Sequence, residues 1–350
     1  MTFPATSGWN NLPNGVWSAT IFSQKAQMAF RKSAVAEDIT NSSYFGEIAN
    51  YGDSVKIIKE PEVAIRAYTR GKQIVPQDLE DDDYTLVIDQ ANEFAFQLED
   101  IEQAHSHVDF MDMASDRAAY KLKDAYDEHV LGYIGGYYKN SSGVWVARTT
   151  YPGTLADETA DSDEYLASHK LDASDFGNGS SGEGIVVGVS GTYDASPLTI
   201  LNRMNRLMNQ DSVPQDGRWV VMDPVMVEKL MDENSKLINA DYNGGSVQTL
   251  ANGRLGPNKL RGFRIYESNN LPYLGTGPGT VVTTGSRTAA NVGVIIAGHD
   301  SAVATASQIN KTEKYRSHDT FADVVRGLHL FGRKILRPES LYRAVYNVNA

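Results

Sequence analysis

The chain has 350 residues, of which 41% are hydrophobic and 22% charged, and its formal net charge at pH 7 is −12. This composition predicts a folded protein with a sizeable core, and the length allows about two domains at roughly 100–200 residues each. The sequence contains no cysteine, which excludes disulfides, thiolate nucleophiles and cysteine-based zinc sites. The acidic balance argues against nucleic-acid binding by a broad basic surface.

The first fifty residues are predicted to form an arm rather than a domain. The N-terminus has no positive region followed by an apolar one, so we expect no signal peptide. The apolar runs are far shorter than the roughly 20 residues that span a bilayer, so we expect a soluble protein. Apolar residues on one helical face predict an amphipathic helix over about 16–35, namely Trp17, Ile21, Met28 and Val35. A single helix cannot bury its own stripe, so the arm must dock on another surface.

Two extended segments follow, 54–68 and 84–97. The first contains Pro61, which is tolerated at a sheet edge. The second has apolar residues at even spacing, which are Leu86, Ile88, Phe94 and Phe96. Together they predict a long hairpin with an acidic tip at 77–83. Because an isolated two-stranded hairpin is marginal in water, we expect it to need a partner surface.

Charge is unevenly distributed over this hairpin. Residues 54–75 carry five basic and two acidic residues, whereas 77–112 carry twelve acids and no lysine or arginine. One interpretation is a solvated acidic face, and the other is a pair of complementary surfaces that meet between subunits. The candidate contact residues on the second interpretation are Lys56, Lys59, Arg66, Arg70, Lys72, Glu93, Glu99, Asp100 and Glu102.

Apolar residues at three- and four-residue steps predict one long helix over about 103–133. At 1.5 Å per residue its length is roughly 46 Å, which indicates an elongated subunit. Residues 137–183 are rich in glycine, serine and acids, and we interpret them as surface loops or an insertion.

From residue 198 the pattern is that of a compact α/β region. The dipeptide Asp223-Pro224 predicts a helix start, because aspartate caps helices and proline fits the first turn. The expected helices are 198–209 and 225–234, and the expected strands are 218–222, 263–267, 292–297, 321–331, 334–337 and 341–348.

The order of these elements resembles the major capsid proteins of tailed bacteriophages. The resemblance is carried by Tyr84–His105, Asp112–Leu131, Gly217–Met231 (GRWVVMDPVMVEKLM), Leu260–Pro272 and Gly327–Val348. It covers about three-quarters of the chain, and residues 137–197 match nothing in it. The resemblance implies an α+β fold with an N-terminal arm, an extended hairpin loop, a long spine helix in a peripheral domain, and an axial domain. The implied boundaries are 1–50 for the arm, 51–100 for the hairpin loop, 101–197 with 301–350 for the peripheral domain, and 198–300 for the axial domain.

The resemblance also implies a function and partners. We expect a structural subunit that self-assembles through hexamers and pentamers into an icosahedral phage head, is made in the host cytoplasm and ends in the virion. We expect a separate scaffolding protein and a portal, double-stranded DNA enclosed without sequence recognition, and no membrane contact. The alternative within the same fold is the shell of a bacterial nanocompartment that encloses cargo enzymes.

No residues point to an enzyme, and we assign no catalytic, cofactor-binding or metal-binding residues. His105, His107, Asp109 and Asp112 are interpreted as the polar face of the long helix rather than metal ligands. The glycine-rich stretch 275–279 lacks the Gly-Lys-Ser/Thr ending of a phosphate loop. The remaining alternative, a hydrolase with its site in 77–112, is disfavoured because the acids form a run rather than a pair in separate environments.

Overall fold

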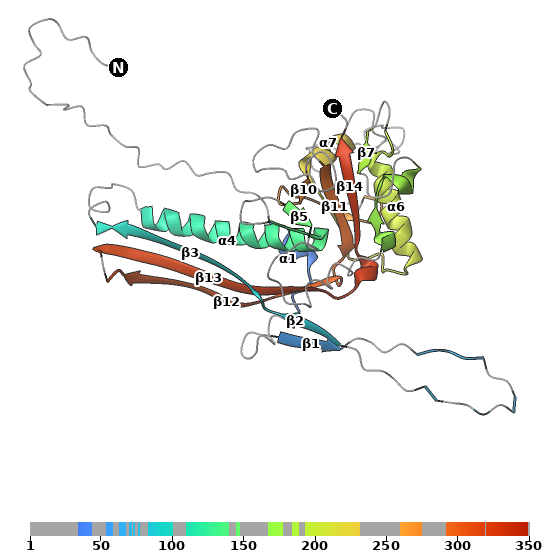
Figure 1. The fold of residues 1–350 in the computed structure, drawn as a ribbon, viewed down its shortest axis with the longest axis horizontal. Helices are drawn as coiled ribbons and strands as arrows, with labels where there is room; N and C mark the ends of the chain where they lie inside the picture. Colours follow the sequence, from blue (N-terminus) through green and yellow to red (C-terminus); the bar gives the residue numbers. More distant parts are fainter. Residues whose placement is uncertain are drawn as a thin grey trace, which may run out of the picture.

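The computed structural model describes residues 34–43, 54–58, 63–67, 70–71, 73, 76–77, 83–100, 110–139, 145–147, 167–177, 184–188, 193–231, 260–274, 292–318 and 320–348. Two units make up the described chain (Figure 1). One is a long three-stranded sheet beneath a long helix, and the other is a seven-stranded sheet flanked by helices.

The elements described are α1 (Ala36–Ile39), β1 (Ser54–Ile58), β2 (Asp83–Val87), β3 (Gln90–Glu99), α4 (Phe110–Gly135), β4 (Tyr137–Lys139), β5 (Trp145–Ala147), β6 (Lys170–Leu171), β7 (Ile185–Val187), α6 (Pro197–Gln210), β8 (Arg218–Met222), α7 (Pro224–Leu230), β9 (Arg264–Glu267), β10 (Tyr273–Leu274), β11 (Val292–His299), β12 (Val303–Arg316), β13 (Ala322–Ile335) and β14 (Tyr342–Val348). Short 3₁₀ helices occupy Ala167–His169, Ala173–Phe176 and Pro338–Ser340.

The predicted long helix is present as α4, with 26 residues and a length of roughly 39 Å. Its predicted first turns, at 103–109, lie outside the described residues. The helix runs along one face of a sheet with strand order β12-β13-β3 (Figure 1). Strands β12 and β13 have 14 residues each, and β13 pairs antiparallel with β3 from Ala322↔Glu99 to Phe331↔Gln90. Strand β12 was not predicted from the sequence.

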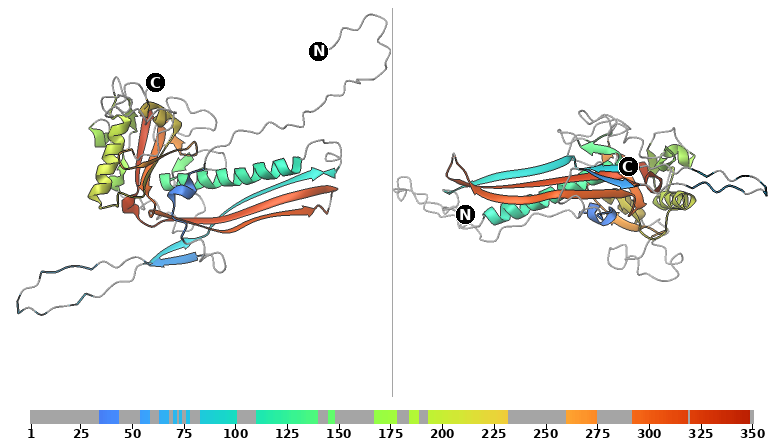
Figure 2. Two further views of the ribbon diagram at one scale, coloured as in Figure 1. Left: turned by 180° about the vertical axis from the view of Figure 1, so that it is seen from behind. Right: turned by 90° about the horizontal axis from the view of Figure 1, so that it is seen from below.

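The predicted hairpin of 54–68 with 84–97 is found only at its base. Strand β1 pairs with β2 from Ser54↔Val87 to Ile58↔Asp83, but Val63–Ala67 have no regular structure. The chain then leaves the hairpin at Ile88, and β3 joins the three-stranded sheet instead. This switch occurs because Leu86 and Ile88 are buried against the β12–β13 region, in a small core. The β1–β2 ribbon lies on the side of the sheet away from α4 (Figure 2).

The seven-stranded sheet has a core on each face, because alternate residues of a strand point to opposite sides. On one face, Val220 of β8 and Ile295 of β11 pack with α6 and α7. On the other face, Trp219 of β8 and Ile296 of β11 pack with the C-terminal half of α4. Its central strand order is β6-β14-β11-β8-β9, with β7 and β10 pairing at β14 and β11.

The helix starts of this unit follow the sequence signals. The Asp223 carboxylate accepts from the Met226 N–H at 3.1 Å, and Pro224 occupies the first turn of α7. The Ser196 hydroxyl accepts from the Thr199 N–H at the start of α6.

Sheet membership differs from the domain boundaries expected from the sequence. Strand β14 lies in the segment 301–350, yet it pairs with β11 of the seven-stranded sheet. Strands β6 and β7 lie in the segment 101–197, and both pair with β14. The cause is burial, since Tyr342 and Tyr346 of β14 face the core beneath α6 and α7. Only β12 and β13 from the C-terminal segment belong to the long sheet with α4.

Candidate assembly surfaces

The end of β1 and the loop that follows it expose large apolar side chains. Ile58 is 77% exposed, Val63 is 65% exposed and Ile65 is 99% exposed. Arg66 and Arg70 in the same loop are also exposed. Apolar side chains that cluster in an exposed segment mark a surface that binds a partner.

The basic candidate residues lie on or near this ribbon. Lys56 projects from the exposed face of β1, together with Ile58, while Val55 and Ile57 face the core. Lys59 and Lys72 lie outside the described residues, as does the acidic candidate Glu102.

The acidic candidates Glu93 and Glu99 lie on β3, on the sheet face away from α4. Strand β3 alternates strictly between exposed and half-buried positions. Phe94, a half-buried position, lines the cavity beneath α4. Residues one step away, including Glu93 and Glu99, therefore face the opposite side and are exposed.

Asp100 has a basic partner within the chain. Its two carboxylate oxygens accept hydrogen bonds from Arg316 at the end of β12. The Arg316 guanidinium holds the pKa of Asp100 below its usual value. Similarly, Asp89 pairs with Arg333 of β13 at 3.0 Å. Part of the acidic segment is therefore balanced internally, which differs from the expectation that its partners lie on a neighbour.

The sheet face away from α4 carries a mixed surface that the sequence pattern did not reveal. Leu328 of β13 lies opposite Glu93 in the strand register and is 38% exposed. Tyr315 of β12 is partly exposed, and the Arg326 guanidinium lies over its ring at 5.0 Å from the centroid. Arg326 also donates to Glu313 at 2.8 Å. This face therefore carries exposed apolar and aromatic side chains beside charged ones.

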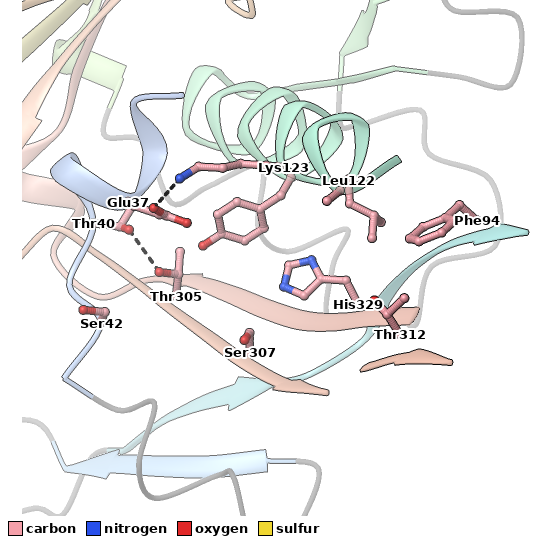
Figure 3. Close-up of a pocket in the computed structure, with 12 residues that line it drawn as sticks. Glu37, Thr40, Ser42, Phe94, Leu122, Lys123, Thr305, Ser307, Thr312 and His329 are labelled. Carbon is pink, nitrogen blue, oxygen red and sulfur yellow. Dashed lines mark hydrogen bonds and ion pairs between the residues drawn. The ribbon is translucent and has the colours of Figure 1, made fainter. Parts of the chain in front are cut away.

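A cavity of about 590 Å³ lies on the other face, between α4, β12, β13 and the segment 37–42. Figure 3 shows His329 and Phe94 rising from the sheet toward Leu122 and Lys123 of α4. Lys123 binds Glu37 at 2.8 Å. Burial lowers the pKa of His329, which stacks on Phe331.

This cavity offers no metal centre. Within the described ranges, no three His, Cys, Asp or Glu side chains are grouped closely enough to hold a metal ion. His105, His107, Asp109 and the stretch 275–279 lie outside those ranges, and the side chain of Asp112 is not described. No helix of the described chain is long and apolar enough to cross a membrane.

The comparisons with known proteins support the fold independently. No protein-family model matches the sequence, and no curated protein matches it. Solved structures agree with this one over nearly the whole chain, and three of them are described here. A structure titled "Mycobacterium phage Che8" is 23% identical with a TM-score of 0.65, and covers 97% of this chain and 98% of its own. The capsid structure of the cyanophage P-SCSP1u is 19% identical, with a TM-score of 0.62 and coverages of 97% and 96%. The cyanophage Pam1 capsid is 12% identical, with a TM-score of 0.66 and coverages of 97% and 99%. The chain therefore has the α+β fold of phage capsid proteins.

Proposed function

From this shared fold we propose that the chain is the major capsid protein of a tailed phage, a structural subunit of the virion rather than an enzyme. The observation that carries the proposal is structural agreement with phage capsid subunits over at least 97% of the chain. An agreement that spans 97% of the chain extends beyond one common motif.

The physical form of the subunit supports self-assembly. Among the described residues of the β1–β2 ribbon, those at its base belong to a small core, whereas Ile58, Val63 and Ile65 are exposed. A two-stranded ribbon is marginally stable alone, so contact with other copies stabilises it. We propose hexamers and pentamers of an icosahedral shell that encloses double-stranded DNA without sequence recognition. A separate scaffolding protein and a portal are the expected further partners.

The two units take the roles expected from the resemblance, with revised boundaries. We assign the seven-stranded sheet with α6 and α7 to the axial domain, including β6, β7 and β14. We assign α4 with the β12-β13-β3 sheet to the peripheral domain.

The charged candidates give this proposal a specific contact. We propose that Arg66 and Arg70 of one subunit meet Glu93 and Glu99 of a neighbour, with Lys56, Lys59, Lys72 and Glu102 extending the contact. Asp100 takes a smaller part because Arg316 already binds it. One exposed ion pair contributes only about 0–1 kcal/mol, so assembly depends on many repeated contacts. The competing interpretation is that the basic residues only keep the ribbon soluble.

A nanocompartment shell is the second candidate, because it has the same fold. The three solved structures described above are titled as a phage or as cyanophage capsids, which favours the phage head. Particles purified with nuclease-protected double-stranded DNA support the phage head. Particles that hold a protein cargo and no protected DNA would support the nanocompartment.

The test of assembly is the molar mass of the purified protein by multi-angle light scattering. We expect capsomers or larger particles, whereas a stable 38.4 kDa monomer at every concentration would refute the proposal. Charge reversal of Arg66 and Arg70 to Glu should leave the subunit folded by circular dichroism but prevent closed particles. Partial rescue by Glu93→Lys with Glu99→Lys supports the contact, and normal particles from the arginine reversal alone leave only the solubility interpretation.

A further inference from the structure

The base of the N-terminal arm is built into the joint between the two units. Val35, Ala36 and Ile39 are all less than 5% exposed. They pack in one core with α4, with β8 and β11 of the seven-stranded sheet, and with the ends of β12 and β13. Residues 35–41, which we call the arm base, are therefore anchored by buried side chains.

Asp127 of α4 holds this segment. One carboxylate oxygen accepts from the N–H groups of Val35 and Ala36, each at 2.7 Å. These N–H groups lie at the N-terminus of α1. The N-cap residue is Val35, whose side chain makes no capping hydrogen bond. The carboxylate of Asp127, which lies about ninety residues further along the chain, thus replaces the local cap.

The second carboxylate oxygen of Asp127 binds the unit that contains the seven-stranded sheet. It accepts from the side-chain amide of Asn270 at 2.8 Å, and Asn270 also donates to Asp124 at 3.0 Å. Asn270 lies just before β10 and is 1% exposed. One buried carboxylate therefore joins the arm, the long helix and the seven-stranded unit.

The Asp127 carboxylate is buried, so it depends on its hydrogen-bond donors. The side chain is fully buried, and burial raises its pKa, while the N–H groups of Ala36, Asn270 and Val35 act in the opposite direction. A buried carboxylate is tolerated only when donors satisfy it, and the N–H groups of Val35 and Ala36 lose this acceptor when it is removed.

A second tie holds the same segment to the long sheet. The hydroxyl oxygens of Thr40 and Thr305 are 3.0 Å apart, as Figure 3 shows. The Asn41 N–H donates to the Val303 carbonyl at 2.8 Å, and the Thr305 N–H donates to the Asn41 carbonyl at 3.1 Å. The arm base thus contacts α4, β12 and the loop before β10 at once.

We propose that Asp127 is a latch that fixes the arm base, residues 35–41, at the joint between the two units, and that closed shells form only when this segment is fixed. The role in shell assembly rests on the proposed function, whereas the latch itself does not. Asp127 is a positioning residue in this account, because it acts through the backbone of residues 35 and 36.

Hydrogen–deuterium exchange on the purified protein tests the latch. In Asp127→Ala we expect the amides of 35–41 to exchange about tenfold faster or more, with the core strands 292–299 and 322–335 unchanged. Asp124→Ala is the matched control, because it removes a hydrogen bond to Asn270 and leaves in place the carboxylate that accepts from the Val35 and Ala36 N–H groups, so it should leave 35–41 protected. Unchanged protection in Asp127→Ala, or equal loss in both variants, would overturn the latch.

A conservative variant covers the case in which Asp127→Ala does not fold. The amide oxygen of Asp127→Asn can still accept from Val35 and Ala36, but its N–H₂ group opposes that of Asn270. We then expect faster exchange in 268–272 than in 35–41. Wild-type exchange rates in both segments would refute the three-way contact.

An engineered disulfide tests what the latch does for assembly. The chain has no cysteine, so Thr40→Cys with Thr305→Cys creates a single intrachain pair that holds the arm base on β12. We expect Asp127→Ala to form few closed particles, and the oxidised pair to restore them while the reduced pair does not. Normal assembly of Asp127→Ala, or no rescue in a folded oxidised protein, contradicts the proposed role. If the wild type itself does not assemble, the shell function fails while the exchange result on the latch stands.

Discussion

Arg316 forms a bidentate ion pair with Asp100, although 216 residues separate them in the sequence. Asp100 follows β3 and Arg316 ends β12, so the pair spans the far end of the three-stranded sheet. Asp323 at the start of β13 binds both Arg316, at 3.3 Å, and Lys314, at 3.1 Å. The ends of all three strands are thereby held together by ion pairs.

Low pH should weaken these ion pairs and those of the neighbouring Glu313, which binds Lys311 and Arg326. Lys311 and then Arg326 lower the pKa of Glu313 to about 2, and Arg316 lowers that of Asp100. A carboxylate with a depressed folded pKa stabilises the fold above its unfolded pKa, and this contribution is lost as the pH falls through the folded pKa. We therefore expect exchange in 311–316 to accelerate between about pH 4 and pH 2, after correction for the intrinsic exchange rate. Glu313→Gln should weaken this pH dependence, whereas Glu267→Gln, on β9, should not. An identical profile in Glu313→Gln would contradict the assignment.

Two glycines of β13 differ in what an added methyl group would meet. A Cβ at Gly332 collides with the backbone of β2, where it would lie against the Val87 oxygen and 3.0 Å from the Ile88 Cα. A Cβ at Gly327 collides only with the ring of Phe94. We expect Gly332→Ala to lose about 1–3 kcal/mol in urea unfolding. We expect Gly327→Ala to recover most of its loss when combined with Phe94→Leu. A full recovery of Gly332→Ala by the same substitution would contradict the crossing of β2 over β13.

The elements that the sequence predicted are those with local signals. Strand β8 and helix α7 lie where Arg218–Met222 and Asp223-Pro224 placed them, because burial on both faces and a cap are readable within a few residues. Strand β12 was missed because its alanine, serine, lysine and asparagine residues have low strand propensity. Pairing with all of β13 makes it a strand, and such non-local pairing leaves no short-range pattern.

The exposure of the candidate contact residues was predictable to a similar extent. The charge split placed Arg66, Arg70, Glu93 and Glu99 on exposed positions, but it could not show that Arg316 binds Asp100 from 216 residues away. The exposed Leu328 was also missed, because a leucine within an apolar strand is expected to be buried. Among the described elements α4 is the one helix that runs along the long sheet, and Leu328 is on the sheet face opposite to it.

The caps of the two helices of the seven-stranded unit should differ in their contribution to stability. Asp223 is 4% exposed, caps α7 and also accepts from the Tyr346 hydroxyl. Asp223→Ala removes a cap, worth about 0.5–2 kcal/mol, and also removes the hydrogen bond from the Tyr346 hydroxyl, worth about a further 0.5–1.5 kcal/mol. Ser196→Ala removes the cap of α6 and an exposed hydrogen bond with the Thr199 hydroxyl, and it serves as the comparison. Urea unfolding should show the larger loss for Asp223→Ala, and equal losses would contradict the second role of Asp223.

The apolar loop residues should matter for assembly and not for folding. Ile65 is 99% exposed, so Ile65→Ser should leave the unfolding free energy of the subunit within about 0.5 kcal/mol of the wild type. The same change should raise the protein concentration needed for particles to form, measured by light scattering. Leu86→Ser is the contrasting variant. Leu86 of β2 is fully buried in the small core between the ribbon and β12, so the substitution should destabilise the subunit itself. An Ile65→Ser protein that assembles at the wild-type concentration would remove this residue from the contact.

Electron microscopy of the purified, unmodified protein tests the central claim most directly. If the chain is a capsid subunit, micrographs should show closed particles with icosahedral symmetry, and their reconstruction should place residues 54–77 of each subunit against a neighbour. A field of dispersed single subunits of 38.4 kDa at every concentration and salt condition would contradict it.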